Sequence, residues 1–150
     1  MNEAIYSLLI GLTGLSVVAL IALLLTVLRL PGASTRPARL RLMRLATGAL
    51  VLQGAHFVEE LVTGFYERYP DLLGLRPWPV AVFVSFNLFW IAVWGFSIAG
   101  LRRPFRAAFF PLWFLGLGAT ANGLAHPLVS VLQGAYFPGL WTSPFVGLAG

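Results

Sequence analysis

Long apolar stretches alternate with short polar segments along the whole chain, and this alternation is its most informative pattern. Four of the stretches approach or exceed the roughly 20 residues that a helix needs to cross the apolar part of a bilayer. We therefore predict an all-α protein, a single domain built as a bundle of four transmembrane helices. The predicted spans cover about residues 4–30, 41–66, 78–101 and 108–132.

Proline and glycine indicate where these spans end. Arg29 is followed by Pro31 and Gly32, which stop the first helix, and a proline- and glycine-rich segment at residues 70–79 is expected to form the second loop. Pro127 lies inside the fourth span, so a kink or an early end is expected there. The first span is too long for a cleaved signal peptide and lacks the basic segment that precedes one, so we expect it to be retained.

The final segment, residues 136–150, contains Ser143 followed by Pro144, a pair typical of a helix N-terminus. Two interpretations are open. The segment is either a short re-entrant or capping element, or the beginning of a fifth helix that the sequence cuts short.

Composition agrees with a membrane location. Hydrophobic residues make up 59% of the chain and charged residues 10%, whereas soluble domains are typically about 25% charged. The net charge of +5 arises from arginines in short loops rather than on one face, which argues against a nucleic-acid partner. Cysteine is absent, so disulfides and thiolate ligands are excluded.

Loop charge predicts the orientation of the bundle. The first and third loops are rich in arginine, and such loops remain in the cytoplasm. The N-terminus, the second loop and the C-terminal segment are therefore expected outside, in a protein that crosses the inner membrane several times. The arginines concerned are Arg36, Arg39, Arg41 and Arg44 in the first loop, and Arg102, Arg103 and Arg106 in the third.

Three ionisable residues lie inside the second span, which is an expensive place for them. His56 is followed three and four residues later by Glu59 and Glu60, so both carboxyl groups share a helix face with the imidazole. A charge at the centre of a bilayer costs about 2.5–3.5 kcal/mol on insertion scales, and such residues face a bundle interior or a water-filled cavity. Gln53 extends this polar face by one turn.

The second histidine of the chain, His126, lies on the fourth span, four residues after Asn122 and on the same face. At about 1.5 Å per residue, Glu60 lies roughly 24 Å from the cytoplasmic side and His126 roughly 22 Å, so the two can be level. His56, Glu59, Glu60 and His126 are therefore candidate ligands of a divalent metal, Zn or Fe. Whichever glutamate the metal leaves free, Glu59 or Glu60, would act as catalytic acid or base.

A structural interpretation of these residues stays open beside the metal site. Histidine and glutamate one turn apart can also hold neighbouring helices together by hydrogen bonds. Asn87, on the third span, could complete the polar cluster or form such a hydrogen bond.

Three motifs occur in order along the chain. They are His56-x-x-Glu59-Glu60, Asn122-x-x-x-His126 and Tyr136-x-Pro138-Gly139-x-x-Thr142. In these motifs the chain resembles the HXXEE family of small bacterial integral membrane proteins, over about residues 44–142. The resemblance implies a shared polar site and supplies no reaction. The Pro138-Gly139 turn, beyond the fourth helix, could fold back over the mouth of a polar cavity or serve as an interfacial turn.

Three functions are compatible with these features. The leading one is a membrane-embedded, metal-dependent enzyme acting on a lipid or another apolar small molecule. The second is a proton- or ion-coupled transport or relay protein, which with so few helices would need to form a homo-oligomer. The third is a structural or accessory membrane subunit whose polar cluster only holds helices together.

Overall fold

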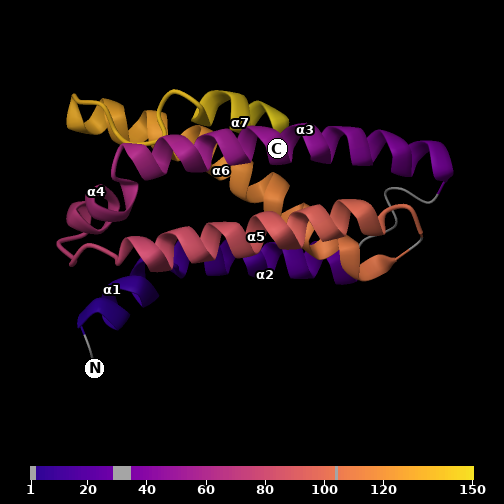
Figure 1. Cartoon of the computed structure of the whole chain (residues 1–150), viewed down its shortest axis with the longest axis horizontal. Coiled ribbons are helices and arrows are strands. Elements are labelled where there is room, and N and C mark those ends of the chain that lie inside the picture. The colour runs from indigo at the N-terminus through magenta and orange to yellow at the C-terminus, as the bar shows by residue number, and fades with distance from the viewer. Residues whose placement is uncertain (1–2, 29–34, 104) are drawn as a thin grey trace.

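The computed structural model describes residues 3–28, 35–103 and 105–150. All regular elements in these ranges are helical. Four long helices, α2, α3, α5 and α6, extend along the length of the molecule, α4 lies across one end, and α1 continues α2 at an angle (Figure 1). The predicted all-α class is therefore confirmed.

The first apolar stretch forms two helices, α1 (Glu3–Gly11) and α2 (Thr13–Leu28), with a turn at Leu12. Tertiary contacts hold α1 in its own direction, because the Ser7 hydroxyl donates to the Arg76 carbonyl at 2.7 Å and accepts from the Trp78 indole at 3.2 Å. The predicted stop at Arg29 to Gly32 lies outside the described residues.

The second stretch forms α3 (Arg36–Val62), which begins earlier than expected because Thr35 caps its N-terminus. A left-handed Gly64 then leads into α4 (Phe65–Leu72). This helix enters the segment predicted as a loop and contains Pro70, which has no N–H to donate to the Tyr66 carbonyl. The Trp78 N–H donates to that carbonyl instead, at 2.9 Å.

The third stretch forms α5 (Val80–Gly100). The fourth begins with a short 3₁₀ turn, η1 (Arg106–Ala108), and continues as α6 (Phe109–Gln133). The early end expected at Pro127 does not occur, because α6 runs on for six further residues to Gln133. At Gly134 the chain leaves the helix through a left-handed conformation.

Two of the four predicted spans, Val80–Gly100 and Arg106–Gln133, are helices long and apolar enough to cross a membrane. The helix α2 is apolar but has only 16 residues, and the mean hydropathy of α3 is lowered by arginines in its N-terminal part and by His56, Glu59 and Glu60 near its C-terminal end. Only 22% of the most apolar part of α5 and 28% of that of α6 are buried, which is unlike the core helices of soluble proteins. Large apolar side chains are exposed on the other long helices too, including Val27, Val51 and Val62.

The last element, α7 (Ser143–Ala149), lies back against α6 and α3, so the C-terminus sits near the middle of the molecule (Figure 1). Its Gly147 meets Gly123 of α6 so closely that a Cβ added to Gly123 would lie 2.5 Å from the Gly147 Cα. Backbones can approach this closely only at glycine.

Candidate functional site: a buried His–Glu–His cluster

Helices α3 and α6 bring His56, Glu60 and His126 together in the interior. The three side chains are 0%, 6% and 3% exposed. Glu60 lies between the two imidazoles, since its Oε1 is 3.5 Å from Nε2 of His56 and 3.5 Å from Nε2 of His126. The rings meet edge to face, with centroids 4.8 Å apart and planes at 84°.

The spacing of the three ligand-type atoms is compatible with an ion held between them. An N–H···O hydrogen bond is typically about 2.7–3.2 Å long, which is shorter than both contacts. Two ligands held at about 2.0–2.2 Å from one tetrahedral ion stand roughly 3.3–3.6 Å apart. His56, Glu60 and His126 each offer one such atom, and these atoms all lie within 4.8 Å of one another.

The tautomer of His126 is fixed by the loop that follows α6. Its Nδ1 is 2.5 Å from the carbonyl oxygen of Pro138, and a carbonyl only accepts, so Nδ1 carries the proton and donates. In the neutral ring, Nε2 of His126 then presents its lone pair toward Glu60.

The tautomer of His56 is fixed by a longer chain of hydrogen bonds. The Thr142 hydroxyl donates to Oε2 of Glu59 at 2.5 Å and lies 2.8 Å from Nδ1 of His56. A hydroxyl has one proton, so Nδ1 of His56 donates to Thr142 and its Nε2 also carries a lone pair. That Nε2 is buried and has no hydrogen-bond partner within the described structure.

The Glu59 carboxylate bonds to the loop after α6 and is not grouped with the two imidazoles and Glu60. Its carboxylate accepts four hydrogen bonds from the loop after α6, including the backbone N–H groups of Trp141 at 3.0 Å and Thr142 at 2.8 Å. Consecutive residues of a helix point about 100° apart, so Glu59 and Glu60 reach different partners. Glu59 therefore lies outside the metal-type cluster and holds the loop beside it.

The loop at residues 136–142 covers the two histidines. Gly139 has φ +88°, and a Cβ added there would lie 2.6 Å from the His126 ring and 2.7 Å from the His56 ring. Beyond the end of α6, the Tyr136 hydroxyl donates to Oε1 of Glu59 at 2.7 Å. Partial burial and this carboxylate raise the pKa of the Tyr136 hydroxyl, so it stays protonated and remains a donor.

A cavity of about 350 Å³ adjoins the cluster, between α1, α2, α3, α4, α5 and α6. Glu60 and His126 line it, and aromatic and aliphatic side chains form most of its remaining wall. The other polar residues predicted for the site, Gln53, Asn87 and Asn122, also line this cavity rather than the cluster itself. The Asn87 amide donates to the Phe83 carbonyl of its own helix at 3.0 Å, and not across to another helix.

Two serines shape the covering loop. Sequence reasoning missed Ser130, and it expected Ser143 as a helix N-cap, whereas Ser143 is the first residue of α7 and Thr142 is the N-cap. The hydroxyl of Ser130 accepts from the Phe137 N–H at 3.0 Å, and Ser143, fully buried, donates to the Leu140 carbonyl at 3.1 Å. Ser130 follows His126 by four residues, so helical spacing was the available signal for it. The role of Ser143 had no comparable signal, because it depends on how the loop closes.

No protein-family model, no curated protein and no solved structure matches this chain. The resemblance to the HXXEE family therefore rests on the three motifs. In space, residues of all three lie around one point: His56, Glu59 and Glu60 of the first, His126 of the second, and Pro138, Gly139 and Thr142 of the third.

Proposed function

We propose that the chain is a membrane-embedded, metal-dependent enzyme whose ion, Zn²⁺ or Fe²⁺, is held by His56, Glu60 and His126. One observation carries the proposal. Two imidazole nitrogens whose tautomers leave lone pairs stand 3.5 Å from the same buried carboxylate oxygen. Two histidines and one carboxylate are a ligand set that both ions accept.

The chemistry of such a site follows from its ligand count. Three protein ligands leave a coordination position for water or substrate, and the bound ion polarises a carbonyl or lowers the pKa of that water. The cavity reaches Glu60 and His126, so a substrate would approach from that side. On the opposite side, Thr142 and Pro138 hold the Nδ1 atoms, which is how outer partners orient metal-binding histidines.

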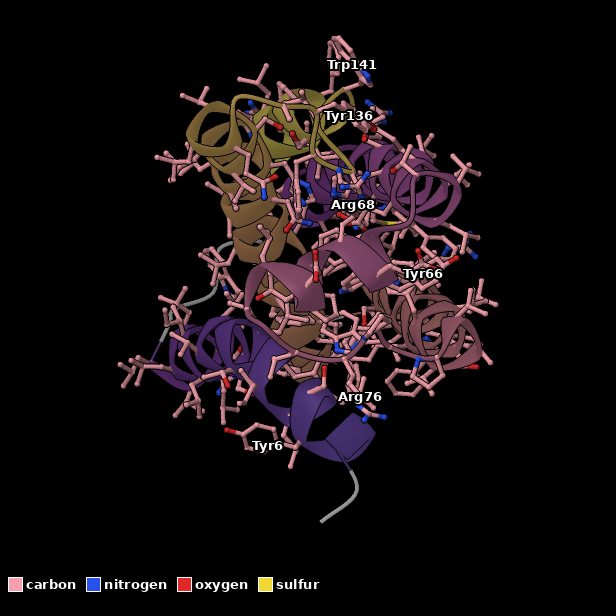
Figure 2. All side chains as sticks on the ribbon, turned by 90° about the vertical axis from the view of Figure 1, so that its left-hand side faces the viewer. Tyr6, Tyr66, Arg68, Arg76, Tyr136 and Trp141 are labelled. Carbon is pink, nitrogen blue, oxygen red and sulfur yellow. The ribbon has the colours of Figure 1, made fainter. Side chains whose placement is uncertain are left out.

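A membrane location is part of the same proposal. It is supported by the two apolar helices α5 and α6, which are mostly uncovered by the rest of the protein. We propose that α2 and α3 cross as well, with the N-terminus outside an inner membrane. Figure 2 looks onto the end assigned to the outer surface, where Tyr6, Tyr136 and Trp141 lie around Arg68 and Arg76, as an aromatic belt requires.

Metal analysis of the purified full-length protein tests the proposal. We expect about one Zn or Fe per chain, and loss of the metal in His56→Ala, His126→Ala and Glu60→Gln. Asn122→Ala is the matched control, because Asn122 lines the same cavity but is not one of the proposed ligands. We expect this variant to retain the metal. A wild-type protein that contains no stoichiometric metal and takes up neither ion on titration would refute the metal centre.

A proton relay is the second candidate, because the polar groups form a continuous path. Tyr136, Glu59, Thr142 and His56 are joined by hydrogen bonds, and Glu60 follows within 3.5 Å of His56. Intramembrane glutamates and histidines carry protons in pumps and transporters. Measurement of proton flux in proteoliposomes tests this candidate. If the chain is a relay, Glu60→Gln should abolish the flux, and unchanged flux in this variant would refute the relay.

A further inference from the structure

The cavity beside Glu60 and His126 is elongated along the helices. On α5 its lining residues extend from Val82 to Trp94, and on α6 from Phe114 to Val129, which correspond to about 18 Å and about 22 Å of helix. Aromatic ring contacts connect the lining residues of α5 and α6 at both ends of the cavity. Trp94 packs on Phe114 at one end, and at the other end the ring of Phe65 packs on both Phe83 and His126.

The volume and the lining restrict what this space can hold. About 350 Å³ spread over that length leaves a narrow channel, which suits a single extended chain better than a fused ring system. Its charged or titratable lining residues are Glu60, His126 and Tyr69, and no arginine of the described residues lines it. A phosphate or carboxylate along the channel would have no cationic side chain as a partner, which is costly away from water, so a polar group fits only at the end where the proposed ion would lie.

Resting on the proposed function, we infer that the substrate is a single-chain lipid with an oxygen function at its end, such as a long-chain alcohol or its ester. The chain lies along the channel toward Trp94. The oxygen end lies at Glu60 and His126, beside the polar amides of Asn87 and Asn122.

Two glycines that line the channel can be replaced by larger residues, which would block the channel without a clash with the backbone. Gly14 and Gly118 both line it, and a Cβ added at either position meets no atom within 4 Å. Gly118→Leu would therefore place an apolar side chain in the channel, about 12 Å along α6 from His126. Gly95→Leu is the matched control, because Gly95 also has open space around its Cβ but does not line the channel.

Tryptophan fluorescence reports binding directly. Trp78, Trp90 and Trp94 line the channel, whereas Trp113 and Trp141 do not, so the latter two are replaced by Phe to remove their signal. The full chain in lipid nanodiscs is titrated with an ω-bromoalkanol, whose bromine quenches tryptophan on contact. A brominated sterol, which is a fused ring system, is titrated in parallel.

We expect saturable quenching by the bromoalkanol and at least roughly tenfold weaker binding of the bromosterol. Gly118→Leu should weaken alkanol binding by roughly tenfold or more, while Gly95→Leu leaves it unchanged. Equal binding of sterol and alkanol, or unchanged quenching in Gly118→Leu, would overturn the inference. Metal content is measured on the same samples. A protein that binds the alkanol but no metal would refute the metal centre alone. A protein that binds metal but not the alkanol would refute the substrate class alone.

Discussion

At the scale of single residues, each histidine of the cluster is held by a different partner on the same loop. Thr142 holds His56, and the Pro138 carbonyl holds His126. Both contacts are made at Nδ1 and leave the lone pair of Nε2 available. The loop therefore sets the tautomer of both rings although it contributes no ligand-type atom to the cluster. Outer contacts of this kind typically contribute 10–100-fold to metal affinity.

Thr142→Val should weaken metal binding about 10–100-fold without removing a ligand, because it deletes the hydroxyl that orients His56. Thr142→Ser keeps the hydroxyl and should restore most of the affinity. Competition with a chelator of known affinity measures the effect. Thr47→Val is the control, since the Thr47 hydroxyl bonds only to a carbonyl of its own helix. Equal affinity in Thr142→Val and the wild type would show that this hydroxyl does not position the ring.

Gly139→Ala should displace both imidazoles and abolish metal binding. A Cβ at this position meets the two rings at 2.6–2.7 Å, and φ +88° is strained for alanine as well. Gly134→Ala separates the two effects, because Gly134 also has positive φ but has no atom within 4 Å of an added Cβ. We expect Gly134→Ala to cost about 1–2 kcal/mol and to retain the metal. Metal content and thermal unfolding are measured for both, and a Gly139→Ala protein that keeps its metal would contradict the close packing.

At the scale of elements, α7 and the loop before it fold back toward the site. The helix is only seven residues long, too short to be stable alone, so it depends on its contacts with α6 and α3. The glycine pair at the α6–α7 crossing makes that contact possible. Glu59 then fastens the other end of the segment by accepting hydrogen bonds from Tyr136, Trp141 and Thr142.

Gly123→Ala should loosen α7, because its Cβ would meet the Gly147 backbone and the helices would have to separate. Overpacking of this kind typically costs about 1–3 kcal/mol. Hydrogen exchange of the amides in Ser143–Ala149 should become faster while exchange in α5 stays unchanged. Gly116→Ala is the control on the same helix, since its Cβ would make an ordinary contact at 3.7 Å. Unchanged exchange in Gly123→Ala would contradict docking through this crossing.

At the scale of the whole molecule, ionisable groups are buried beside the apolar core, while many large apolar side chains are exposed. Buried positions include His56, Glu60 and His126, while apolar residues such as Phe96, Val131 and Leu148 are 77–89% exposed. In water this arrangement would leave an extended apolar surface, which marks an interaction or membrane site. The proposed bilayer covers that surface and leaves the polar cluster inside the protein.

Single-cysteine labelling tests the proposed orientation, and the chain has no cysteine to interfere. Asp71, on α4, and Arg103, just beyond the end of α5, are both exposed, and α4 and this end of α5 lie at opposite ends of the molecule (Figure 1). In intact cells, Asp71→Cys should react with a membrane-impermeant maleimide, and Arg103→Cys should react only after permeabilisation. The reverse labelling would invert the proposed topology, and equal labelling of both sites in intact cells would argue against crossing of the membrane between them.

The sequence by itself determined the helical class and the shared face of His56 and Glu60, because both follow from periodicity within a few residues of chain. It also indicated His126 as a partner, since few ionisable residues occur in the apolar stretches. Local pattern could not separate the roles of Glu59 and Glu60, nor predict the break at Leu12. Those features depend on residues distant in sequence, such as Thr142 for Glu59 and Arg76 for Ser7. Only the tertiary structure decided which lone pairs meet at Glu60 and which helices enclose the cavity, because both require the packed positions of α2, α3, α5, α6 and the covering loop.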